Sequence, residues 1–236
     1  IDILFNFLNE NNIKLNVGTV FFGGGSPTIL NREDTKKLVD KLKTLFDWSN
    51  VEFFTIESDP RRVDEDRLLY NHEACGVNRI SFGMQDLDPD VQRRVNRIQP
   101  AKLFEDILTE KVRKVYQEIA FDLLIGQPGQ TVSSMEKTCD GVIKLKPTLV
   151  QLSLMAYKPW VSKYQIRMVE EGPLPDFLER KEMMEVIHKK LSKAGYIRTG
   201  FECYSLPDSP MTKAFIDGEA HYGASGRQPG GRVNFI

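Results

Sequence analysis

Short apolar runs rich in β-branched and aromatic residues alternate with longer amphipathic stretches along most of this chain. The runs are Val17–Phe22, Val51–Ile56, Asn78–Phe82, Ile119–Ile125 and Leu149–Met155. Each run has the length of a buried strand, and the stretches between them have the periodicity of helices. Strands that alternate with helices form a parallel sheet, because each helix carries the chain back to the start of the next strand. The pattern predicts an α/β fold, either an open doubly wound sheet or part of a (β/α) barrel.

Helix signals fall between these strands. Helices are predicted at Asp2–Asn11, from Asn31 through Leu45, at Asp64–Cys75, from Pro89, at Ala101–Tyr116, at Thr131–Lys144 and at Phe177–Ala194. Asn31 is a favourable N-cap, and Gly76 and Gly195 are suited to end the helices that precede them. After Met155 the alternation stops. A loop is predicted at Tyr157–Trp160, and one more strand at Tyr196–Tyr204.

Polar or glycine-rich groups follow the predicted strands. They are Gly24-Gly25-Ser26-Pro27-Thr28, Glu57-Ser58-Asp59-Pro60, Gln85-Asp86, Asp122 with Gly126-Gln127-Pro128-Gly129-Gln130, and Tyr157-Lys158. In parallel α/β folds the carboxyl ends of the strands meet at one edge, where ligands bind. The sequence therefore predicts one binding site at that edge.

The chemistry of these groups suits a ligand with amino-acid and ribose parts. Glycine-rich backbone exposes N–H and C=O groups to an ammonium and a carboxylate. Glu57 and Asp122 can each accept from two hydroxyls of a ribose, and Arg97 can hold a carboxylate with its planar fork. Plainer interpretations remain open: a turn that lets a helix pack closely, a helix cap or salt bridge, and a solvated arginine. The glycine spacing fits neither a Walker A loop nor a dinucleotide fingerprint.

Composition excludes several classes of protein. The 236 residues carry 32 basic and 33 acidic side chains, so the net charge of −1 does not indicate a nucleic-acid or membrane binder. No apolar run is long enough to span a bilayer, and no signal peptide is visible. The three cysteines, Cys75, Cys139 and Cys203, are far apart, which favours buried thiols in a reducing compartment over a disulfide framework. The three histidines show no metal-ligand spacing.

Five motifs, in this order and spacing, resemble oxygen-independent coproporphyrinogen III oxidase and its relatives in the radical S-adenosylmethionine (SAM) family. The motifs are Phe22-Gly-Gly-Gly-Ser-Pro-Thr28, Ile56-Glu-Ser-Asp-Pro60, Gly76-Val-Asn-Arg-Ile-Ser-Phe-Gly-Met-Gln-Asp86, Val91-Gln-Arg-Arg-Val-Asn-Arg97 and Asp122-Leu-Leu-Ile-Gly-Gln-Pro-Gly-Gln-Thr131. The resemblance runs from about Val17 to Asp217.

The resemblance implies a partial (β/α) barrel of the radical SAM type, with a [4Fe–4S] cluster on a Cys-x-x-x-Cys-x-x-Cys loop and SAM on its open iron. Cleavage of SAM would yield a radical that abstracts hydrogen from the substrate. By the same resemblance, Gly24, Gly25 and Ser26 surround the methionyl amino group and Glu57 contacts the cluster-bound SAM. Gln85, Arg97 and Asp122 match residues placed around a second SAM. Lys158 matches a position that contacts the first SAM, although the Tyr157–Trp160 segment departs from the family motif.

The cluster cysteines of the family have no counterpart in this sequence. Both ends of the sequence are expected to be cuts through a larger protein, because the sequence begins within a predicted helix and ends at an apolar run, Val233–Ile236. The barrel is expected to be incomplete at both ends, with residues 1–160 supplying its central βα units and residues 161–236 its C-terminal part. The chain alone is expected not to assemble the cluster and to be fragile, because a missing strand leaves an unpaired edge.

The function implied by the resemblance is the oxidative decarboxylation of coproporphyrinogen III to protoporphyrinogen IX in a cytoplasmic enzyme. Its partners would be a tetrapyrrole, either a porphyrinogen or haem, and an electron donor such as flavodoxin or ferredoxin. Two other branches stay open, a haem chaperone and a SAM-dependent methyltransferase or haem-degrading enzyme. An unrelated aldolase-like barrel is a further alternative.

Overall fold

A computed structural model describes residues 2–13, 15, 17–223 and 226–228 of the chain. Its main sheet has seven strands in the order β1-β2-β3-β4-β5-β7-β6. They are β1 (Thr19–Phe22), β2 (Phe53–Ser58), β3 (Arg79–Gln85), β4 (Glu118–Ile125), β5 (Leu149–Leu154), β7 (Cys203–Ser205) and β6 (Ile197–Arg198). The first five are parallel, in the order of the sequence, so their carboxyl ends share one edge of the sheet.

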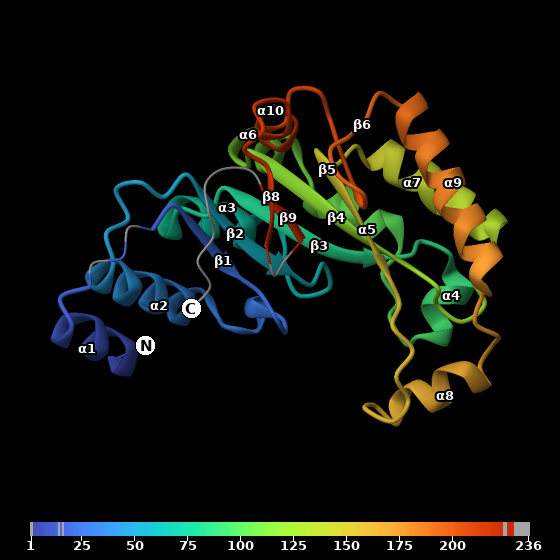
Figure 1. Ribbon diagram of the computed structural model, residues 1–236, viewed down its shortest axis with the longest axis horizontal. Coiled ribbons are helices and arrows are strands. Elements are labelled where there is room, and N and C mark those ends of the chain that lie inside the picture. Colours follow the sequence, from blue (N-terminus) through green and yellow to red (C-terminus); the bar gives the residue numbers. More distant parts are fainter. Residues whose placement is uncertain (1, 14, 16, 224–225, 229–236) are drawn as a thin grey trace.

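Helices connect these strands, as the alternating pattern predicts (Figure 1). The α-helices are α1 (Asp2–Glu10), α2 (Arg32–Leu45), α3 (Glu65–Tyr70), α4 (Pro89–Arg94), α5 (Ala101–Ile107), α6 (Glu110–Val115), α7 (Val132–Leu145), α8 (Tyr164–Glu170), α9 (Phe177–Lys193) and α10 (Pro210–Ile216). Two short helical turns, η1 (Pro27–Ile29) and η2 (Asn71–Cys75), and a hairpin of β8 (His221–Gly223) and β9 (Gly226–Gln228) complete the described elements.

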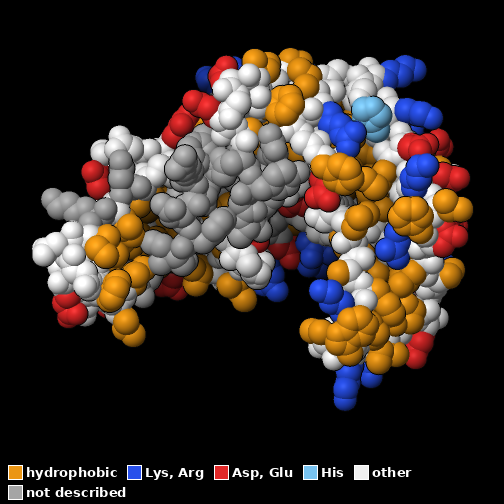
Figure 2. All heavy atoms as spheres, viewed as in Figure 1, with side chains coloured by type: hydrophobic (Ala, Val, Ile, Leu, Met, Phe, Trp, Pro, Cys, Tyr) orange, Lys and Arg blue, Asp and Glu red, His pale blue; other side chains and the backbone are white. Residues whose placement is uncertain are grey.

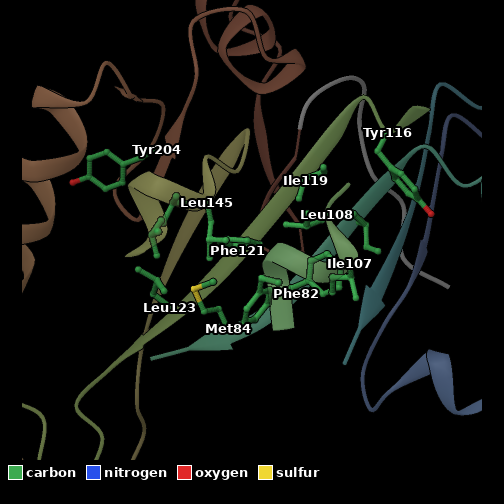
Figure 3. Packing of buried hydrophobic residues seen from close by; sticks show 14 of the residues in the cluster. Phe82, Met84, Ile107, Leu108, Tyr116, Ile119, Phe121, Leu123, Leu145 and Tyr204 are labelled. Carbon is green, nitrogen blue, oxygen red and sulfur yellow. The ribbon is translucent and has the colours of Figure 1, made fainter. Parts of the chain in front are cut away.

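The main core lies between the sheet and the helices that cover one of its faces. Alternate residues of β3 and β4, among them Phe82 and Phe121, point into this core and pack with Phe104 of α5 (Figure 3). Phe104 and Phe121 have ring centroids 5.2 Å apart, and Phe82 packs edge-on against both. Burial of such aromatic side chains stabilises the layer by a few kcal/mol each. The residues between them on the strands therefore face the opposite side of the sheet, where the site is built.

Helix ends follow the predicted caps. The Asn31 side chain accepts a hydrogen bond from Asp34 N, and Gly76 adopts a left-handed φ of 86° at the end of η2. The prediction of one long helix at Ala101–Tyr116 is wrong. The helix ends with α5, and Thr109 caps a separate helix, α6. A side chain that caps the next helix competes with continuation of the first one.

The C-terminal third differs most from the prediction. The single strand expected at Tyr196–Tyr204 is instead two short strands, β6 and β7. Strand β7 runs antiparallel to β5, and β6 antiparallel to β7. Helices α8 and α10 were not predicted, and the apolar run Val233–Ile236 lies outside the described residues.

The predicted class, an α/β fold with a partial barrel, is confirmed: the sheet is mixed, twisted and not closed. Among the described residues, no helix is both long enough and apolar enough to cross a membrane.

Candidate functional site

The face of the sheet opposite the main core holds a pocket. Strands β1 to β5 line it with alternate side chains: Phe21, Thr55, Glu57, Arg79, Ser81, Glu118, Ala120, Asp122, Leu149 and Gln151, with Ile80 at its margin. Glu57 lies near the carboxyl end of β2, and Asp122 lies in the middle of β4. The two carboxylates predicted from the sequence thus share one pocket, but this pocket extends along the strands to the first residues of β3, β4 and β5 and is not confined to their carboxyl ends.

Glu57 is held by the glycine run that follows β1. Its Oε2 accepts a hydrogen bond of 2.9 Å from Gly24 N, and Gly24 has a φ of +101°, which favours glycine. A Cβ at Gly23 would lie 2.1 Å from the Phe21 ring and 2.9 Å from the Glu57 carboxyl carbon, so glycine lets both side chains approach the backbone here. Gly25 has open space above it, and Ser26 Oγ lies 3.1 Å from Thr28 Oγ1. The run therefore forms an exposed backbone cradle beside an anchored carboxylate.

Asp122 is a half-buried carboxylate with a single described hydrogen-bond partner. Ser81 Oγ of the neighbouring strand donates to its Oδ2 at 2.6 Å. The pKa of Asp122 is raised from 3.8 to about 6, mainly by burial and to a smaller extent by the like charge of Glu57, whereas the Ser81 hydrogen bond opposes the shift. A carboxylate that is costly to ionise without a ligand is typical of a site prepared for hydroxyl or cationic groups.

Gln85 and Arg97 meet over Gly83. Strand β3 changes register between Phe82 and Gln85, and Gln85 has a left-handed φ of 66°. A Cβ at Gly83 would lie 2.7 Å from Gln85 Nε2 and 3.0 Å from Arg97 Nη2, so both side chains cover this glycine. Arg97 Nη2 also donates to Gly83 O at 2.9 Å, and burial lowers the pKa of its guanidinium. The bulge therefore brings together two of the three residues expected around a second SAM.

Lys158 is not brought to this pocket. It lies exposed in the loop after β5, where its backbone carbonyl accepts from Val161 N at 2.9 Å and its N–H donates to the Gln165 side chain. The pocket that contains Glu57 and Asp122 does not include it.

Two features of the pocket were not predicted. One is Ser81, the partner of Asp122. The other is a buried ion pair in which Arg79 Nε donates to Glu118 Oε1 at 2.9 Å, while Arg79 Nη1 donates to Thr55 Oγ1 at 3.3 Å. Arg79 and Ser81 are alternate residues of β3, and Glu118 is on the same face of β4 as Asp122, so these side chains all face the pocket. Polar residues spaced two apart within an otherwise apolar strand were the signal available in the sequence.

Comparison with known proteins gives the family. The model of the radical SAM superfamily matches residues 8–142, more than half of the chain. The chain belongs to this superfamily. Its members use SAM and a [4Fe–4S] cluster.

Relatives with similar sequences include coproporphyrinogen oxidases. Coproporphyrinogen III oxidase, anaerobic 1, of Cereibacter sphaeroides is 32% identical over 197 residues, which is 84% of this chain and 43% of that protein. Oxygen-independent coproporphyrinogen III oxidase of Pseudomonas aeruginosa is 32% identical over 223 residues, 93% of this chain and 48% of that protein. The chain thus spans about half the length of the curated relatives it matches.

A solved structure confirms the fold. Coproporphyrinogen III oxidase (HemN) from Escherichia coli, described as a radical SAM enzyme, matches with a TM-score of 0.84 and 28% identity over 91% of this chain and 49% of its own. An archaeal Elp3 from Methanocaldococcus infernus matches with a TM-score of 0.58 at 14% identity over 77% of this chain, a likeness of fold alone.

The described residues fit one of the two cofactors of the family. The open glycine cradle and the carboxylates Glu57 and Asp122 suit the amino-acid and ribose parts of SAM. They do not fit the cluster: Cys75, Cys139 and Cys203 are separate, buried, free thiols, as predicted. Within the described part of the chain, no three His, Cys, Asp or Glu side chains group as metal ligands.

Proposed function

We propose that this chain is the SAM-binding barrel of an oxygen-independent coproporphyrinogen III oxidase. The observation that carries the proposal is the half-buried Glu57–Asp122 pocket beside the Gly23–Gly25 cradle. The oxidase names of the relatives support the reaction, the conversion of two propionate side chains of coproporphyrinogen III to vinyl groups.

Each residue of the pocket has a distinct part in this proposal. The Gly24 and Gly25 backbone receives the amino-acid end of SAM, with Ser26 at its margin, and the Gly24 N–H keeps Glu57 oriented towards the ligand. Asp122, oriented by Ser81, accepts hydrogen bonds from ribose hydroxyls and is ionised once it is bound to them. Gln85 and Arg97 present an amide and a guanidinium to a carboxylate, as expected for a second SAM.

SAM bound to a reduced cluster would supply radical chemistry, the removal of a hydrogen atom from the propionate chain. That chemistry needs a site without water, and the apolar side chains of Phe21 and Leu149 in the pocket wall would help to exclude it. Lys158 is proposed to contact the first SAM only through its backbone, which requires the loop after β5 to rearrange. An electron donor such as flavodoxin or ferredoxin completes the system. The free, buried thiols support a reducing cytoplasmic compartment.

Binding of SAM by this chain is the first test. Isothermal titration at pH 7.5 should give a dissociation constant that rises at least tenfold in Glu57→Gln and in Asp122→Asn, the loss expected for one charge-assisted hydrogen bond. Asp217→Asn, which removes an exposed carboxylate at the end of α10, is the matched control and should bind as the original chain does. Equal affinity in all four proteins would refute the assignment of the pocket.

The reaction needs the length that the relatives have beyond this chain. In a chimera, the chain replaces the matching segment of the E. coli oxidase, and the protein is reconstituted anaerobically with iron and sulfide. Reduced with dithionite, it should form 5′-deoxyadenosine and release carbon dioxide from coproporphyrinogen III. If it instead keeps haem bound without turnover, or transfers a methyl group to haem, the function is that of a haem chaperone or of a methyltransferase.

A further inference from the structure

Helix α8 is unusual because it buries none of its seven residues. Together with the turn before it, the helix presents an exposed apolar surface: Trp160 is 79% exposed, Val161 75%, Tyr164 52% and Ile166 44%. We call these four residues the α8 face. Figure 2 shows hydrophobic side chains gathered over this lobe, which projects beside the sheet in Figure 1. Helices this short are not stable alone in water, so something must hold α8 in place.

The end of α8 is fixed to the loop that follows β4. Gly129 N donates to Pro173 O at 2.8 Å, and an Arg94 guanidinium nitrogen donates to Glu171 O. Arg94 fills the space that side chains at Gly129 and Gly172 would occupy. The two glycines and the arginine thus form a close, specific joint at the carboxyl edge of the sheet.

The start of the segment is fixed to the same edge. Met155 N donates to Ile125 O, the last residue of β4, at 2.7 Å. The Gln165 side chain then ties α8 back to the strand exit by donating to Ala156 O at 3.0 Å. Both ends of the segment are therefore anchored at the carboxyl ends of β4 and β5, and its apolar residues remain exposed.

The surroundings of the α8 face are basic. Lys158, Lys163 and Arg167 are exposed and, within the described residues, none of them forms an ion pair. Glu170 and Glu171 follow at the far end of the helix. A ligand that matches this surface has a broad apolar body and several carboxylates at its rim.

We propose that the α8 face binds one side of the tetrapyrrole, with Lys163 and Arg167 holding its propionates. This inference rests on the proposed function, since coproporphyrinogen III is an apolar macrocycle with four propionate side chains. The size of the surface supports a small ligand over a protein: the four side chains expose on the order of 400 Å², about half of what each partner gives to a stable protein interface. The anchored helix would hold the bound macrocycle at the carboxyl ends of β4 and β5.

Trp160 offers a direct measurement. Trp48→Phe removes the other tryptophan of the chain and leaves Trp160 as its sole reporter. Coproporphyrin III, the stable oxidised form of the substrate, absorbs where tryptophan emits and should quench Trp160 on binding. In this background, Lys163→Glu with Arg167→Glu should weaken coproporphyrin III binding at least tenfold at low salt, and Val161→Ser with Ile166→Ser should do so at any salt. Charge reversal at two exposed lysines of other helices, Lys137→Glu with Lys189→Glu, is the control and should have little effect.

The outcomes separate this inference from the proposed function. Unchanged SAM affinity in the α8 variants, with the expected loss of coproporphyrin III, supports both. If coproporphyrin III binds every variant equally, the α8 face is not the tetrapyrrole site, although the proposed function stands. If the chain binds neither SAM nor coproporphyrin III, the proposed function itself fails. Trp160 emission that changes with protein concentration alone would show that a second copy covers the face, which overturns the inference.

Discussion

Asp122 is expected to lower the free energy of unfolding of the protein when no ligand is bound, because its carboxylate is buried for its role in the site. Its pKa is about 6 in the folded chain against 3.8 for an ordinary aspartate, because it is buried next to Glu57. The difference of about two pKa units corresponds to roughly 3 kcal/mol. Since the side chain is partly exposed, solvent screening lowers the effect to about 1–2 kcal/mol. Asp122→Asn removes this cost, because the amide is neutral and its oxygen still accepts from Ser81.

The sign of the effect follows from proton linkage. Between pH 3.8 and about 6 the folded chain binds more protons at Asp122 than the unfolded chain does, so this group lowers stability as the pH rises. The stabilisation by Asp122→Asn should therefore be close to zero near pH 4, grow through pH 5 and 6, and be complete above about pH 7.

Urea unfolding of both proteins at a series of pH values measures this difference directly. Asp217→Asn controls for the loss of one exposed negative charge. Ser81→Ala is a second test of the same cause. Loss of its hydrogen bond should raise the pKa of Asp122 further and move the pH range of the stability change upward. A stability difference that is independent of pH, or destabilisation by Asp122→Asn at pH 7, would refute this reasoning.

Three further perturbations test other parts of the site. Gly23→Ala should weaken SAM binding more than tenfold in isothermal titration, because the new Cβ would displace both the Phe21 ring and the Glu57 carboxylate. Unchanged affinity would mean that the glycine run can shift without loss of the site. Arg79→Met should lower the free energy of unfolding by about 3–5 kcal/mol by leaving Glu118 charged and unpaired, whereas Arg79→Met with Glu118→Leu should recover most of it in urea unfolding. Gln85→Gly should change the free energy of unfolding by less than about 1 kcal/mol, because glycine accepts the left-handed φ at this position. The variant should still weaken SAM binding. A loss of unfolding free energy as large as the loss of binding free energy would mean that Gln85 acts only through the backbone.

Much of the fold could be predicted from the sequence because its strands are chemically distinct. The five parallel strands lie within three residues of the predicted boundaries, since β-branched and aromatic runs end at glycine, proline or acidic residues. The helix predicted at Ala101–Tyr116 failed for a local reason: apolar periodicity continues through the break, and only the capping hydroxyl of Thr109 marks it. The antiparallel return of β7 depends on tertiary pairing with β5, which no local pattern encodes.

The site was predictable where one rule sufficed. Parallel strands bring their ends together, which was enough to place Glu57 and Asp122 in one pocket. Lys158 was assigned to the first SAM by the resemblance, and it follows a strand end as well. The chain turns away after β5 towards α8, so the strand end does not bring Lys158 into this pocket, and its assignment stays a prediction. The position of Gln85 depends on a register shift in β3, which moves a side chain relative to the alternation of the strand.

The two walls of the proposed site differ in how they are stabilised, and this difference bears on function. The Asp122 pocket is built on the central strands, whose side chains are locked by the core behind them, so its carboxylates can be kept in an unfavourable state without moving. The α8 face is anchored only at its two ends and buries none of its residues, so its position costs little to change. A rigid wall is suited to a cofactor whose reactive atom must be placed accurately. A loosely held apolar wall is suited to a large ligand that must enter and leave.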